Sequence, residues 1–184
     1  LFRDRYSTSI NFKELEDLFK GRDWLVFLYK EQGTNLPESP KVAKKVYVAT
    51  SNRNNVYPIL IDALRQQGFD PYDYRDPSYG FSWNQVDENF ESWDTSDYIR
   101  AFANDPRCKH AIDRDKRAIE ECDVFILLAP YTSRSTIELG YAAGRGEKTF
   151  AVIPEDYHPR PNVMLGMADV IVTSLTELFV RLHD

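Results

Sequence analysis

The chain has 184 residues, of which 42% are hydrophobic and 28% charged, and its formal net charge is −6. This balance predicts one soluble domain with a full hydrophobic core, and the negative charge excludes a surface that coats a nucleic-acid polymer. No apolar run is long enough to cross a membrane, and no signal-peptide pattern opens the chain. The two cysteines, Cys108 and Cys122, and the scattered histidines form neither a disulfide framework nor a metal-ligand spacing. We therefore expect a cytoplasmic protein without a metal.

The chain divides into an N-terminal extension, residues 1–41, and a main domain, residues 42–184. In the main domain, apolar β-branched runs predict strands, and each of the longer runs is followed by a helical pattern. After the first run, a helix is expected over residues 57–67 and ends at Gly68. Strands that alternate with helices favour an α/β fold, in which a parallel sheet of about five strands is covered on both faces. The predicted strands are 45–50, 70–74, 123–129, 148–153 and 169–173.

Residues 75–95 interrupt this alternation. They are rich in Asp, Pro, Gly, Asn and aromatic residues, and Trp83 lies among them. A long irregular segment of this kind is more often a functional loop or lid than a linker.

Glu138 follows the most strongly apolar strand, residues 122–130, after a polar loop over residues 131–135. We expect a helix to begin at Thr136, which would place this glutamate in the first helical turn. Open α/β sheets bind ligands at this edge, and the helix dipole there favours an ionised carboxylate. Glu138 is therefore a candidate nucleophile or polar anchor, although it could also serve only to complement the dipole.

The segment 137–142, with Gly146 and then residues 150–157, resembles the nucleoside 2-deoxyribosyltransferase family, which includes nucleoside 5′-monophosphate N-glycosidases. That family carries a Glu-Leu-Gly-Tyr-Ala element, a strand and an Ile-Pro-acidic turn in this order. Asp115, eight residues before Asp123, also matches the family's spacing. The resemblance covers roughly residues 44–182 and continues through residues 161–164.

This resemblance implies a flavodoxin-like, doubly wound sheet and an enzyme that cleaves the N-glycosidic bond of nucleosides or nucleotides without a cofactor. Glu138 would be the nucleophile, and Tyr47 would orient its carboxylate. Asp115 would bind the base and help to protonate it as it leaves. Asn162 matches an asparagine that reaches the neighbouring subunit's site, which implies a homodimer or a larger assembly.

The polar loop before Glu138 departs from the pattern of the transferases, which place an aspartate six residues before the nucleophile. Hydroxyl groups and one cation stand here instead, and they suit the oxygens of a phosphate better than a neutral sugar hydroxyl. Ser51 and Arg53 resemble the phosphate-contacting Ser-x-Arg of the monophosphate hydrolases. Together they favour a nucleoside 5′-monophosphate as ligand. The loop residues are Thr132, Ser133, Arg134 and Ser135.

Each candidate also has a purely structural interpretation. Tyr74 or Trp83 could stack on the base, or they could form a hydrophobic plug beneath the loop. Asp115 could belong to a solvated helix face, and Tyr47 to the core. The arginines could lie on the surface, and Asn162 could be a turn residue.

Hydrolysis of a nucleoside monophosphate through Glu138 is the leading functional hypothesis, because a carboxylate can capture the anomeric carbon covalently. Three alternatives stay open: exchange of the base, cleavage of NAD at the nicotinamide bond, and a non-catalytic nucleotide-binding domain.

Overall fold

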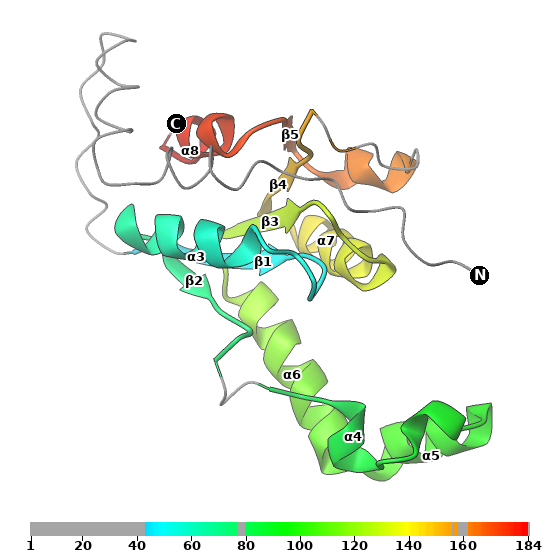
Figure 1. Cartoon of the computed structure of the whole chain (residues 1–184). Helices are drawn as coiled ribbons and strands as arrows, with labels where there is room; N and C mark the ends of the chain where they lie inside the picture. The colour runs from blue at the N-terminus through cyan, green and yellow to red at the C-terminus, as the bar shows by residue number, and fades with distance from the viewer. Residues whose placement is uncertain (1–42, 77–79, 156, 158–161, 184) are drawn as a thin grey trace, which may run out of the picture.

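The computed structural model describes residues 43–76, 80–155, 157 and 162–183, and its core is a sheet of five parallel strands (Figure 1). The strands lie in the order β2-β1-β3-β4-β5. This order confirms the predicted α/β fold, since it is the flavodoxin-like arrangement. In chain order the strands are β1 (Lys45–Ala49), β2 (Asp70–Tyr72), β3 (Val124–Leu128), β4 (Lys148–Val152) and β5 (Val170–Val172).

Helices cover both faces of the sheet, because successive side chains of each buried strand point to opposite sides. In β1, Val46 and Val48 belong to the apolar cluster with α3 and α8. Tyr47 and Ala49 belong to the second cluster, with α6 and α7. The covering helices are α3 (Tyr57–Gln66), α6 (Pro106–Glu120), α7 (Ser133–Arg145) and α8 (Leu175–His183).

The ends of the helices follow local signals, although one of them begins earlier than predicted. α3 ends where expected, just before Gly68, whose backbone φ of +82° favours glycine. α7 begins at Ser133 rather than Thr136, because the Thr132 side chain caps it by accepting a hydrogen bond from the Ser135 amide. The polar loop predicted at residues 131–135 is thus mostly the first turn of this helix.

Between β2 and the middle of α6 the chain leaves the sheet and forms a projection, residues 81–110, which we call the arm (Figure 1). The segment predicted to be irregular therefore contains short helices. Ser82 and Gln85 form a capping box at the first of them. The arm consists of α4 (Trp83–Val86), η2 (Phe90–Ser92), α5 (Thr95–Asn104) and the first turn of α6.

A last short helix, η3 (Val163–Met167), lies beside α7 and precedes β5. The predicted N-terminal extension, residues 1–41, lies outside the described residues. In the part of the chain that the structure describes, no helix combines the length and the apolarity needed to cross a membrane.

Candidate active site

A cavity of about 170 Å³ lies at the carboxyl ends of β1 and β3, on the α6–α7 side of the sheet. The strand order reverses at β1, and the crevice at such a point is where open α/β sheets bind ligands. A larger cavity, about 360 Å³, lies at the opposite, amino ends of β1 and β2, and Glu138 does not reach it. The predicted site residues that line the smaller cavity are Tyr47, Tyr74, Asp115, Arg134 and Glu138.

Glu138 reaches the cavity from the second turn of α7, not from the first turn as predicted. Ser135, Leu139 and Ala142 are buried at intervals of three or four residues and form the helix face against the sheet. Glu138 flanks this face, so its carboxylate is half-buried at the edge of the cavity.

The environment of Glu138 favours its neutral form, which is opposite to the expectation from the helix dipole. Burial raises the pKa of its carboxyl group to about 7. The Arg134 guanidinium and a hydrogen bond from Tyr47 lower the pKa, whereas the Asp115 carboxylate raises it. Burial dominates because the carboxylate has lost hydration, and the dipole is strongest only at the first turn.

Tyr47 lies in the middle of an aromatic row that crosses three strands. Its ring stacks on Tyr72 of β2, with centroids 5.4 Å apart, and on Phe125 of β3, with centroids 5.5 Å apart. These residues are in register across the sheet. The row fixes the Tyr47 ring in the wall of the cavity that Glu138 also lines.

Asp115 projects from α6 and is held by its neighbours. The Tyr72 hydroxyl donates a hydrogen bond to Asp115 Oδ1 at 2.9 Å. Arg114 donates to the same oxygen from Nε, at 3.1 Å, and from Nη2, at 2.9 Å. Asp115 thus forms a local ion pair on the helix and keeps 39% of its side chain exposed, and it also lines the cavity with Glu138.

At the start of α7, only one of the four predicted loop residues lines the cavity. Arg134 does so, and its Nη2 donates to Asn52 Oδ1 at 2.9 Å. Thr132 is the helix cap, and Ser133 is exposed. Ser135 is fully buried, and its hydroxyl donates to the Thr50 carbonyl oxygen at 3.0 Å, joining α7 to the loop after β1.

The predicted Ser-x-Arg pair lies in the loop after β1 but outside the cavity lining. The Ser51 amide donates to the Pro130 carbonyl oxygen at 3.0 Å, and the Ser51 hydroxyl accepts a hydrogen bond from the Arg53 amide. Arg53 is exposed. Asn52, between them, is the residue of this loop that lines the cavity and contacts Arg134.

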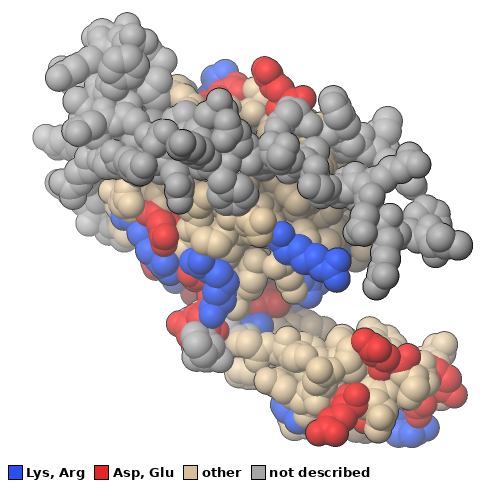
Figure 2. Space-filling model, in the orientation of Figure 1, with Lys and Arg blue, Asp and Glu red and all other residues tan. Residues whose placement is uncertain are grey.

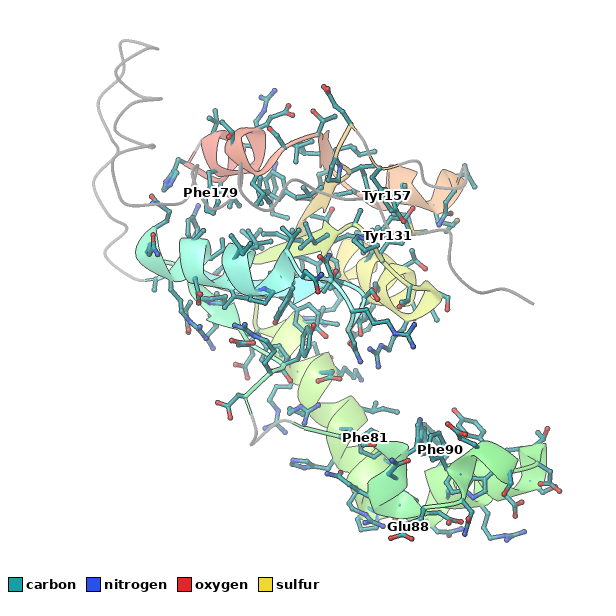
Figure 3. The ribbon with its side chains drawn as sticks, viewed as in Figure 1. Phe81, Glu88, Phe90, Tyr131, Tyr157 and Phe179 are labelled. Carbon is teal, nitrogen blue, oxygen red and sulfur yellow. The ribbon has the colours of Figure 1, made fainter. Side chains whose placement is uncertain are left out.

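The two aromatic candidates lie in different places. Tyr74 lines the cavity and stacks on Tyr57 of α3, with centroids 4.3 Å apart. Trp83 lies in the arm, where its ring contacts Phe81, Trp93 and Tyr98, and the structure does not bring it to the cavity. Phe81, and not Trp83, is the aromatic residue of the arm that lines the cavity, and it lies beside α6 (Figure 3).

Asn162 is separate from these residues. It caps η3, and its Oδ1 accepts a hydrogen bond from the Met164 amide at 3.0 Å. Its local role is that of a helix cap, and its predicted contact with a neighbouring subunit stays a prediction.

Sequence reasoning missed Arg114 and Asn52. The only feature of the sequence that could have indicated them is their position next to candidate site residues: Arg114 precedes Asp115, and Asn52 lies inside the Ser-x-Arg pair. Beside Tyr74, Asp73 forms an ion pair with Arg75, at 2.7 Å.

Charges of both signs are interspersed over the described surface in Figure 2. Within the described ranges, no group of three His, Cys, Asp or Glu side chains could hold a metal ion. The ionisable side chains that line the cavity are two carboxylates, two tyrosines and two arginines.

Comparison with known proteins gives likenesses of structure. Neither a protein-family model nor a curated protein matches the sequence. A conserved protein from Enterococcus faecalis V583 aligns over 76% of this chain and 96% of its own, with a TM-score of 0.51 and 13% identity. A 2-deoxyribosyltransferase from Bacillus psychrosaccharolyticus aligns over 73% and 89%, with a TM-score of 0.50 and 16% identity.

A CMP N-glycosidase from Clostridium botulinum aligns over 76% of this chain and 98% of its own, with 20% identity and a TM-score of 0.45. The likenesses to the Enterococcus protein and the transferase agree with the family resemblance of the sequence at the level of the fold. The chain therefore shares its fold with a solved 2-deoxyribosyltransferase.

Proposed function

We propose that this protein is an N-glycosidase that cleaves the bond between the base and the sugar of a nucleoside 5′-monophosphate. The observation that carries this proposal is the meeting of two carboxylates in one cavity. Glu138 comes from α7 and shares the cavity lining with Tyr47 of β1, and Asp115 comes from α6 and accepts a hydrogen bond from Tyr72 of β2. Paired carboxylates of this kind are the machinery with which glycosidases cleave a glycosidic bond.

The proposed reaction uses the two carboxylates in different roles. The ionised Glu138 forms a bond to the anomeric carbon while the carbon–nitrogen bond breaks, and the electron pair of that bond leaves with the base. Asp115 acts as the acid: its carboxyl proton passes to the departing nitrogen, and the resulting carboxylate takes up a proton from the water that attacks in the next step. Water then attacks the anomeric carbon of the glycosyl-enzyme, which releases the sugar phosphate and frees the Glu138 carboxylate.

The other end of the cavity supports a phosphorylated ligand. Arg134 lies in the first turn of α7, where backbone amides and the helix dipole favour an anion. Its guanidinium is exposed and lies against Asn52 of the neighbouring loop. A 5′-phosphate bound there would leave the sugar between Arg134 and the two carboxylates.

The test is to incubate the protein with nucleoside monophosphates, the matching nucleosides and NAD, and to measure the free base by chromatography. We expect base release from a monophosphate, and a loss of roughly 10³-fold or more in Glu138→Ala. The matched control is Glu88→Gln, which alters an exposed glutamate of the arm. If no compound is cleaved faster by the native protein than by Glu138→Ala, the proposed activity is refuted.

The same assay separates the remaining alternatives. A new nucleoside on addition of a free acceptor base would indicate base exchange, which is the activity of the transferase with the same fold. Release of nicotinamide alone would indicate cleavage of NAD. Tight binding without product, equal in the native protein and Glu138→Ala, would indicate a non-catalytic nucleotide-binding domain.

A further inference from the structure

A pair of stacked tyrosines from neighbouring strands lies beside the two carboxylates of the site. Tyr47 of β1 and Tyr72 of β2 are partners in the register of the parallel pair. Their rings are stacked, with centroids 5.4 Å apart and planes 9° from parallel. Tyr47 lines the cavity together with Glu138, and the Tyr72 hydroxyl donates a hydrogen bond to Asp115.

The two oxygens of Asp115 are not equivalent. Oδ1 accepts three hydrogen bonds, one from the Tyr72 hydroxyl and two from the Arg114 guanidinium. Among the described residues, none donates a hydrogen bond to Oδ2. A carboxylate that is anchored through one oxygen leaves its other oxygen available to a ligand. A ligand in the cavity would therefore contact Oδ2.

We propose that Tyr72 is a positioning residue, which acts on the ligand only through Asp115 and Tyr47. Its hydroxyl fixes the Asp115 carboxyl group with Oδ2 toward the departing base. Its ring is stacked on Tyr47, which fixes the direction in which this hydroxyl points. This inference rests on the proposed function, because the positions matter only if both carboxylates act on one ligand.

The Tyr72 hydroxyl is well suited to donate to the Asp115 carboxyl group. Burial and the Asp115 carboxylate raise the pKa of Tyr72, so its hydroxyl keeps the proton that it donates.

The test is a double-mutant cycle between Tyr72→Phe and Asp115→Ala, with kcat and KM measured on the best monophosphate. Tyr72→Phe removes the hydroxyl and leaves the ring stack. We expect its kcat to fall about 10- to 100-fold with little change in KM, since a hydrogen bond to a charged group is lost. In the Asp115→Ala background, Tyr72→Phe should have no further effect. Tyr98→Phe, at an exposed tyrosine of α5, is the matched control.

Three outcomes would overturn the inference. If Tyr72→Phe has the kcat of the native protein, the hydroxyl does not position Asp115. If its loss is the same with and without Asp115, Tyr72 has only a structural role, and a lowered melting temperature would accompany it. Both results leave a Glu138-dependent cleavage intact, so they differ from a failure of the proposed function. If nothing is cleaved, the proposed function fails and this inference fails with it.

Discussion

At the scale of single residues, the buried carboxylate of Glu138 sets the expected pH dependence of activity. Its pKa is about 7, raised chiefly by burial, and the nucleophile must be ionised to attack. We therefore expect kcat/KM to rise tenfold for each pH unit below about 7 and to level off above it. A steady-state pH profile on a monophosphate checks this. A profile that is flat from pH 5 to 8 would contradict it.

The same burial predicts that Glu138 lowers the stability of the protein at alkaline pH. Its pKa in the folded protein, about 7, lies above its ordinary value of 4.5, so the folded state binds more protons between these values. The free energy of unfolding therefore falls as the pH rises from 4.5 to 7. Glu138→Gln should be more stable than the native protein by about 1–3 kcal/mol at pH 8 and equally stable at pH 4.

Urea unfolding at pH 4 and pH 8 measures this difference. Glu88→Gln, at an exposed position, serves as the control and should change stability at neither pH. An equal loss of stability of Glu138→Gln at both pH values would mean that the carboxylate makes a favourable contact in the folded state.

At the scale of elements, the two arginines that we predicted to bind phosphate lie in different places. Arg134 lines the cavity, whereas Arg53 is exposed outside it. Arg134→Ala should raise the KM for a monophosphate about tenfold and leave the KM for the matching nucleoside nearly unchanged, because only the phosphate loses a partner. Arg53→Ala should change neither value.

Arg134→Ala should also move the pH profile. Arg134 lowers the pKa of Glu138, so its removal shifts the rising limb of kcat/KM to higher pH. Steady-state kinetics of both variants on both substrates supply the comparison. A larger effect of Arg53→Ala would transfer the phosphate site to the loop after β1.

The strands were predictable because each is an apolar run bounded by polar or turn residues, as at residues 123–129 for β3. The start of α7 was harder to predict, because its first turn consists of polar residues that are common in loops. The capping box of Thr132 and Ser135 was the available signal. The helices of the arm are three to ten residues long, and the shortest give too few positions for a periodic pattern.

The candidate site was predicted in part. Glu138 was selected from its place after a buried strand, Asp115 and Tyr47 were selected through the family resemblance, and the structure brings the three to one cavity. The partners of these residues were not predicted. Tyr72 and Asp115 are 43 positions apart, and their contact depends on the strand register and on the path of α6. No local pattern encodes such a contact.

At the scale of the whole molecule, an exposed apolar surface supports the predicted self-association. Ile137 of α7 is 73% exposed, and Val163 of the adjacent η3 is 89% exposed. An uncovered patch of this kind often marks an interface. We expect a dimer by light scattering, converted to a monomer by Val163→Glu. Ile99→Glu, at an exposed residue of the arm, is the control and should leave the dimer intact. If only Ile99→Glu yields a monomer, the interface lies on the arm instead.

α6 is a single uninterrupted helix of fifteen residues, and it belongs to two parts of the molecule. Its last turns pack on the sheet through Ile119, and its first turn belongs to the arm. Asp115 lies between them. At about 1.5 Å per residue this helix is about 22 Å long, so a tilt of the arm relative to the sheet would also displace Asp115, the proposed acid.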